Sequence, residues 1–347
     1  MTKLASKLVL DGNGSYLGME KGCFVLKDKQ GEINRYPLFE QEIGEVILKS
    51  GNSISTGALA SMGFWDIDVL VMTQRGRPVA MLKSLDDDSH VQTRVAQYQA
   101  SLDERAFKIS KHIVMAKLDG QNIILRKYGL KPHFDDFREE IERTETKSLE
   151  LFRRRITGIE GKHTQRYYKQ IFSLFPEKIR PQSKEGFMAY DGTNNIFNLA
   201  YEILAWKVHR ALIKAKLEPY LGFLHSNQMG KLSLVCDFQE LYRYLIDDFL
   251  IQYCQRINKK DFVTKTENAT RKKKGRREYL NNSETNELLR ELNQFFEVKV
   301  EVARIRNGEH QTIETLINEE AMLFSKYLRN ELENWKPRLP TSSYERD

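Results

Sequence analysis

Length, composition and charge narrow the classes of protein to which this chain can belong. The chain has 347 residues, more than usually fold around a single hydrophobic core, which favours two domains. Its formal net charge is +7. The 8 prolines and 20 glycines exclude general disorder, and the most apolar runs, such as residues 69–72, are far too short to span a membrane.

The cysteines and the start of the chain predict a cytoplasmic protein. Cys23, Cys236 and Cys254 form no Cys-x-x-Cys pair, and their odd number and wide spacing argue against disulfides or a zinc–thiolate site. The opening residues, MTKLASKLVLDG, lack the apolar stretch of a secretory signal peptide. We therefore expect the chain in a reducing compartment.

Residues 1–84 predict an N-terminal antiparallel β domain. Short apolar or alternating runs are separated by segments rich in Gly, Asp, Asn and Pro, which favour turns. These runs are 7–10, 23–26, 46–49, 67–72 and 79–82. A short helix is expected near 55–61.

An acidic, polar segment at 85–91 is expected to link this domain to a larger, all-helical one at 92–340. The fold class predicted is therefore α+β. Within the second domain, residues 194–216 have helical periodicity. The longest apolar stripe, 238–257, has i, i+3, i+4, i+7 spacing and predicts one buried helix of about five turns.

The basic charge is concentrated in residues 259–277. This segment holds nine Lys and Arg and two acids, which accounts for the whole net charge of +7. Such a cluster attracts a polyanion such as DNA or RNA, because each phosphate contact releases condensed counterions. A solvated, mobile loop without a partner is the alternative, and charge alone does not decide between them.

Three short segments carry residue types that can bind a metal ion. Glu160 lies at an expected break between two helical stretches, or else near a helix start, where it would favour the helix dipole. His225 ends an apolar run ahead of a polar loop, where an ordinary histidine would donate to the backbone. Asp237 and Glu240 are three apart at an expected helix start, the spacing of a capping box.

The same spacing places Asp237 and Glu240 on one side of the first helical turn. A neighbouring imidazole would complete a set of oxygen ligands with one nitrogen. That set suits Mn²⁺ or Mg²⁺ better than a structural zinc ion.

In order along the chain, these segments resemble the CRISPR-associated integrase and endonuclease family of spacer acquisition. The match consists of Glu-Gly at 160–161, Gly-Phe-Leu-His-Ser at 222–226 and Ser-Leu-Val-Cys-Asp-Phe-Gln-Glu-Leu-Tyr-Arg at 233–243. Weaker likeness covers nearly the whole chain. The resemblance implies that Glu160, His225 and Glu240 bind Mg²⁺ or Mn²⁺. It also implies that Asp237 belongs to the catalytic set, as a ligand or as a neighbour of the ligands.

The resemblance further implies what the protein does. The helical domain would be catalytic and would insert protospacer DNA into a CRISPR array through attack by a 3′-hydroxyl on a phosphodiester. Expected partners are double-stranded and branched DNA, a second copy of the chain bound partly through the β domain, and the family's small "Cas-two" protein. Expected phosphate contacts, each with a solvated surface cation as the alternative, are Arg166, Lys231, Arg243, Lys272, Lys273, Lys274 and Arg276.

Two other interpretations stay open from the sequence. One is a non-catalytic DNA-binding scaffold that relies on its basic segment and on dimerisation. The other is an unrelated metal-dependent nuclease with a helical catalytic domain.

Overall fold

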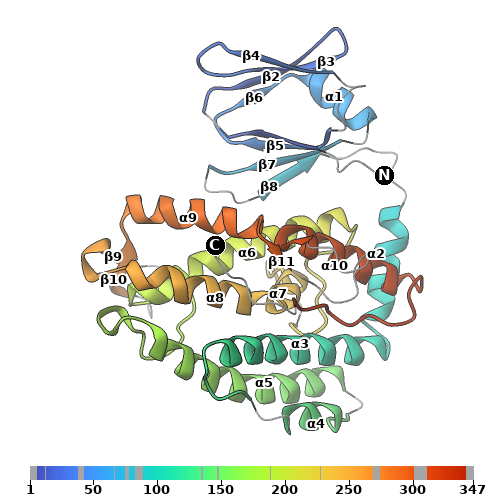
Figure 1. Ribbon diagram of the computed structural model, residues 1–347. Helices are drawn as coiled ribbons and strands as arrows, with labels where there is room; N and C mark the ends of the chain where they lie inside the picture. Colours follow the sequence, from blue (N-terminus) through green and yellow to red (C-terminus); the bar gives the residue numbers. More distant parts are fainter. Residues whose placement is uncertain are drawn as a thin grey trace. The chain divides into compact units, whose positions relative to one another are not determined.

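Two structural units, Met1–Ser89 and His90–Asp347, make up the chain in the computed structural model (Figure 1). The structure describes residues 6–11, 13–37, 43–65, 67–74, 78–82, 89–133, 136–146, 148–187, 189–226, 228–268, 274–300 and 311–340. The linker expected at 85–91 lies partly outside these residues. Its last part, 89–91, belongs to helix α2, Ser89–Ala100, so the helical region begins earlier than predicted.

Two four-stranded sheets and one helix form the first unit. The sheet orders are β1-β5-β7-β8 and β4-β3-β2-β6. The strands are β1 (Ser6–Leu10), β2 (Tyr16–Glu20), β3 (Cys23–Lys27), β4 (Ile33–Pro37), β5 (Ile43–Lys49), β6 (Ser53–Ile54), β7 (Asp68–Met72) and β8 (Pro78–Leu82). Helix α1, Thr56–Phe64, is the short helix expected here, and Ser55 caps it by accepting a hydrogen bond from the backbone N–H of Ala58 at 3.1 Å.

A strand-rich first domain is confirmed, but the expectation of purely antiparallel pairing is wrong in part. β2 and β3 form an antiparallel hairpin, and its turn residues Lys21 and Gly22 both have positive φ, as a tight two-residue turn requires. The pairs β1–β5, β5–β7 and β2–β6 are parallel. Turn residues predict only hairpins, whereas a parallel pair needs a longer connection, such as the segment with β6 and α1 that joins β5 to β7.

The second unit is mostly helical, as expected. Its further helices are α3 (Arg105–Lys127), α4 (Asp136–Glu142), α5 (Leu149–Ile171), α6 (Gly192–Lys214), α7 (Ser233–Glu240), α8 (Arg243–Tyr253), α9 (Asn282–Phe296) and α10 (Ile313–Leu328). Its strands are β9 (Phe262–Asn268), β10 (Lys274–Leu280), β11 (Lys299–Val300) and β12 (Gln311–Thr312). The description as all-helical is therefore wrong for these strands. Within the described ranges, no helix is long and apolar enough to cross a membrane.

Most described residues of the basic segment 259–277 lie in two antiparallel strands, β9 and β10, and not in a loop. β9 and β10 pair antiparallel along their full length. The valine and threonines of β9 favour this conformation, because β-branched side chains suit extended strands. Residues 269–273, which include Lys272 and Lys273, lie outside the described residues.

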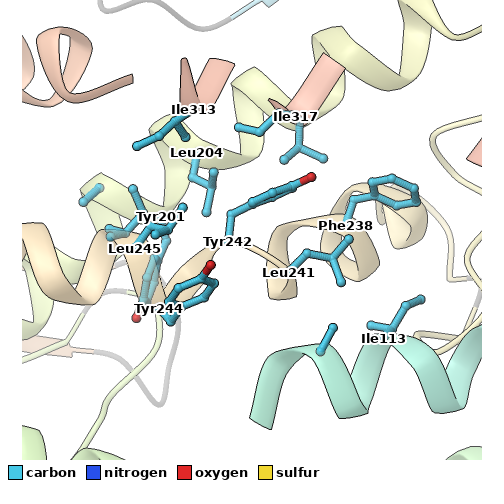
Figure 2. Packing of buried hydrophobic residues seen from close by; sticks show 14 of the residues in the cluster. Ile113, Tyr201, Leu204, Phe238, Leu241, Tyr242, Tyr244, Leu245, Ile313 and Ile317 are labelled. Carbon is cyan, nitrogen blue, oxygen red and sulfur yellow. The ribbon is translucent and has the colours of Figure 1, made fainter. Parts of the chain in front are cut away.

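The apolar stripe 238–257 is buried as expected, but it does not form one helix. α7 and α8 are separate, and Tyr242 between them has φ −123° and ψ −3°. The periodicity continues across the break because the side chains on both sides face the same core, which Figure 2 shows around Leu241, Tyr242 and Leu245. The break leaves Glu240 at the C-terminal end of α7.

Candidate metal-binding and catalytic site

Glu160 lies in the middle of α5, which continues unbroken from Leu149 to Ile171. Both expectations for its position, a helix break and a helix start, are therefore wrong. The glycines on either side, Gly158 and Gly161, each weaken a helix by about 1 kcal/mol relative to alanine. The packing of α5 against α3 compensates for this cost. The carboxylate is thus carried by a continuous, packed helix.

Sequence reasoning missed a lysine that joins two of the expected ligands. Lys117, on α3, places its Nζ atom 2.5 Å from Oε1 of Glu160 and 2.6 Å from Oε2 of Glu240. All three side chains are largely buried: Lys117 is 10% exposed, Glu160 17% and Glu240 7%. The signal that could have found Lys117 is a cation inside an apolar stretch, because a buried lysine needs an acidic partner.

Each of the two carboxylates has a second anchor. Oε1 of Glu160 accepts a hydrogen bond from Oγ1 of Thr164, one turn further along α5, at 2.7 Å. Oε1 of Glu240 accepts one from Nη1 of Arg243 at 2.7 Å. The two acids therefore keep their orientation through contacts within their own segments, in addition to the shared ammonium group.

Glu240 stays ionised in spite of its burial. Burial by itself would raise the pKa of Glu240, but nearby positive charges outweigh that effect and lower the pKa to about 2. The largest contributions come from Arg243 and Lys117. A buried position that keeps a carboxylate charged is well suited to hold a cation.

Asp237 fixes the loop that carries His225. Its Oδ1 accepts hydrogen bonds from the ring Nδ1 and the backbone N–H of His225, at 2.7 and 2.9 Å. Its Oδ2 accepts the backbone N–H groups of Phe223 and Leu224, at 2.6 and 3.0 Å. Because a carboxylate group accepts this bond, Nδ1 is the donor, and in the neutral imidazole the lone pair then lies on Nε2, as metal ligation requires. The imidazole is 27% exposed and therefore accessible.

Asp237 does not cap a helix, so the capping-box expectation is wrong. α7 begins at Ser233, and Asp237 lies one turn inside it. Both oxygens of Asp237 accept hydrogen bonds from the His225 loop, so Asp237 supports His225. Its membership of the catalytic set stays a prediction. The loop packs closely on α7 because position 222 is a glycine: a Cβ atom there would lie 2.7 Å from Cβ of Ser233.

The expected phosphate contacts differ in their surroundings. Those that are exposed or partly exposed are Arg166, Lys231, Lys274 and Arg276. Arg243 is instead paired with Glu240, and its guanidinium lies 4.4 Å from the ring centre of Tyr201. Its position makes it a support for the acidic site. DNA contact by all seven expected residues stays a prediction.

The donor set fits a hard divalent cation, although it is not arranged as a finished metal site. In the part of the chain that the structure describes, no three His, Cys, Asp or Glu side chains are placed to hold an ion. Glu160 and Glu240 nevertheless share one cation, the ammonium group of Lys117, and two carboxylates with an imidazole are typical ligands of Mg²⁺ or Mn²⁺. The residues that could hold the ion are Glu160, Glu240 and His225.

Solved structures identify the fold. A casposase bound to integration product aligns with a TM-score of 0.71 at 20% sequence identity, over 98% of this chain and 99% of that chain. A CAS1 protein from Thermotoga maritima aligns with a TM-score of 0.64 at 17% identity, over 93% of this chain and 96% of that chain. The fold is therefore the one shared by casposases and Cas1 proteins.

Sequence comparison identifies the family. The model of the family described as CRISPR associated protein Cas1 matches residues 8–285, and the chain belongs to this family. The CRISPR-associated endonuclease Cas1 of Korarchaeum cryptofilum is 26% identical over 270 residues, which is 72% of this chain and 78% of that protein. A Cas1 endonuclease of Archaeoglobus fulgidus is 28% identical over 272 residues, 71% of this chain and 76% of that protein. The family resemblance predicted from the motifs is confirmed.

Proposed function

We propose that this Cas1-family protein is a Mg²⁺- or Mn²⁺-dependent endonuclease and integrase that inserts protospacer DNA into a CRISPR array in antiviral defence. The observation that carries the proposal is the convergence of Glu160 and Glu240 on one cation, the ammonium group of Lys117. The imidazole of His225, hydrogen-bonded through Nδ1 to Asp237, supplies the third expected ligand. Relatives named as endonucleases support cutting, and a casposase bound to integration product supports joining.

The proposed reaction is a transesterification at phosphorus. The 3′-hydroxyl of the protospacer attacks a target phosphodiester; a new P–O bond forms, and the bond to the target's 3′-oxygen breaks, which releases a new 3′-hydroxyl. When bound, Mg²⁺ or Mn²⁺ would supply positive charge to stabilise the attacking and leaving oxygens. With water as nucleophile, the same site cuts a strand, and no covalent intermediate with the protein is needed.

The protein's own residues orient the groups of this site. The residues that would hold the ion are Glu160, His225 and Glu240. Asp237 keeps the lone pair of the imidazole on Nε2. Thr164 and Arg243 hold the two carboxylates, so that less reorganisation is needed when substrate and ion bind.

The proposal includes the expected partners. Complexes named Cas6-RT-Cas1–Cas2 share this fold with TM-scores of 0.64 and 0.68, which supports the small Cas2 protein as a partner. A structure named as a TtCas1-DNA complex, with a TM-score of 0.56, supports DNA as the ligand. Double-stranded and branched substrates, a homodimer formed partly through the first unit, and a cytoplasmic location complete the proposal.

A strand-transfer assay with the full chain and its Cas2 partner tests the proposal. Labelled DNA with a free 3′-hydroxyl is mixed with a supercoiled plasmid that carries a CRISPR repeat, in Mn²⁺ or Mg²⁺. Glu160→Ala and His225→Ala should each lower joining by roughly 100-fold or more, because a ligand of the ion is lost. Glu139→Ala, which removes an acid 61% exposed on α4, should join at the wild-type rate.

Other results would favour the alternative functions. Metal-independent DNA binding without joining, unaffected by Glu160→Ala, would indicate a scaffold. Hydrolysis of simple duplexes without insertion of a 3′ end would indicate an unrelated nuclease. Wild-type joining by Glu160→Ala or His225→Ala would exclude that residue from the site.

A further inference from the structure

Lys117 lies between the two carboxylates that a divalent ion would have to share. We propose that Lys117 is an internal counter-cation, which holds Glu160 and Glu240 together in the metal-free protein and must leave them when a divalent ion binds. Lys117 therefore competes with the metal and tunes the affinity of the site. This inference rests on the proposed function, because it takes Glu160 and Glu240 as metal ligands.

The distances make the two cations mutually exclusive. Nζ of Lys117 is 2.5 Å from Oε1 of Glu160 and 2.6 Å from Oε2 of Glu240. Bonds from Mg²⁺ or Ca²⁺ to protein oxygens are about 2.0–2.6 Å long, so an ion bound to these two oxygens would coincide with the ammonium group. Two positive charges cannot share one largely buried position, and the ion can enter only as the ammonium leaves.

The site tolerates this exchange because its parts are held independently. Glu160 keeps the hydrogen bond from Thr164, and Glu240 keeps the one from Arg243. Lysine suits a displaceable role, since its compact charge sits on a flexible four-carbon chain that can turn away without backbone movement. The two acids thus remain in place for the incoming ion.

Lys117→Met should bind Mn²⁺ more tightly than the wild type. Methionine keeps much of the length of lysine but removes the competing charge, and the two carboxylates, left without a shared cation, repel each other until an ion binds. We expect the dissociation constant for Mn²⁺ to fall roughly 10-fold. Without metal, Lys117→Met should melt at a lower temperature than the metal-free wild type. Addition of Mn²⁺ should raise the melting temperature of Lys117→Met more than that of the wild type.

Lys117→Arg should have the opposite effect. A guanidinium group binds carboxylates through paired, parallel hydrogen bonds, so it competes more strongly than an ammonium group does. We expect Mn²⁺ to bind more weakly than to the wild type. General damage to the site would weaken binding in both variants, whereas competition predicts changes in opposite directions.

Calorimetric titration of the metal-free full chain with MnCl₂, without DNA, measures these affinities. The matched control is Lys127→Met, on the same helix. Lys127 is 19% exposed and pairs with Asp248 at 2.9 Å, which is not a candidate ligand, so this variant should retain wild-type affinity. Glu240→Gln shows whether the measured heat comes from the proposed site, because it should bind Mn²⁺ much more weakly.

The outcomes separate this inference from the proposed function. Wild-type or weaker Mn²⁺ affinity in Lys117→Met would overturn the counter-cation role and leave the metal site intact. If Lys117→Met does not fold, the Mn²⁺ affinity of Lys117→Arg provides the test. Binding of Mn²⁺ by Lys117→Arg that is as tight as in the wild type, or tighter, would overturn the counter-cation role. Equal binding by the wild type and Glu240→Gln would instead contradict the proposed metal site.

Discussion

Asp237 illustrates at the residue scale how one buried carboxylate can organise a loop. The carboxylate of Asp237 accepts hydrogen bonds from the ring N–H of His225 and from the backbone N–H groups of residues 223–225. Hydrogen bonds to a charged group each contribute about 1.5–3 kcal/mol, roughly twice a neutral bond. Ser110 and Arg153 also donate to the carbonyl of Phe223, at 2.9 and 2.5 Å, so α3, α5 and α7 all fix the imidazole.

Asp237→Asn should leave the chain folded but lower strand transfer about 10- to 100-fold, the usual effect of losing a partner of a metal ligand. The amide has the size of the carboxylate, but it lacks the charge and presents an NH₂ donor to the N–H groups of residues 223–225. Rates of joining and Mn²⁺ affinities would be compared with those of Asp119→Asn, a matched change at a partly exposed acid on α3. Equal rates for the two variants would show that Asp237 does not position His225.

At the scale of secondary-structure elements, the close packing of α3 brings the site together. α3 lies against α5, α7 and α8, and it carries Lys117. Three residues later, Gly120 faces α8, where a Cβ atom would lie 2.3 Å from Cδ1 of the buried Tyr244 ring. The approach of α3 to α8 therefore requires a glycine at this position, although glycine is a poor helix former.

Gly120→Ala and Gly158→Ala should change stability in opposite directions, although both glycines lie inside helices. The methyl group at 120 collides with Tyr244 and should lower the free energy of unfolding by about 1–3 kcal/mol. A Cβ atom at position 158 would meet no other side chain or neighbouring element within 4 Å. Alanine there should therefore raise the free energy of unfolding by about 0.5–1 kcal/mol, because alanine favours the helix more than glycine does. Urea unfolding followed by circular dichroism measures both, and a gain in stability at 120 would contradict the packing described.

For the molecule as a whole, the distribution of charge matters more than its total. The formal charge outside residues 259–277 is zero, because that segment carries the entire excess of +7. Its described cations include Lys274 and Arg276, both exposed on β10. If the protein binds DNA as proposed, this hairpin should be responsible for much of the salt dependence of binding.

Replacing Lys274 and Arg276 together by alanine should flatten that salt dependence. The plot of log affinity against log salt concentration has a negative slope, and each lost phosphate contact reduces its magnitude by about 0.9. The slope of the double variant should therefore be shallower by roughly two. Because phosphate contacts carry no sequence information, the loss should be similar for unrelated duplexes. Fluorescence anisotropy over a salt series measures the slope, with Arg143→Ala as control, since Arg143 directly follows α4 and its side chain is 75% exposed. A wild-type slope would place the hairpin outside the DNA interface.

The sequence by itself determined the broad organisation of this protein. Apolar residues that recur every two residues in one part of the chain and about every 3.6 residues in the other separated a strand-rich part from a mostly helical part. The helical period also predicted the burial of the stripe 238–257. Family motifs directed attention to Glu160, His225 and Glu240. These signals could be recognised because periodicity and motifs lie within short, continuous windows of the chain.

Only the tertiary structure decided which distant groups meet. Three kinds of contact join separate segments: the parallel pairing of β1 with β5, the ion pairs of Lys117 with two acids, and the hydrogen bonds that the His225 loop donates to Asp237. Local patterns hold no information about such contacts, because each depends on how elements far apart in the sequence pack against one another. The charge of Lys117 is balanced by other helices, so its own segment gave no sign of its partners.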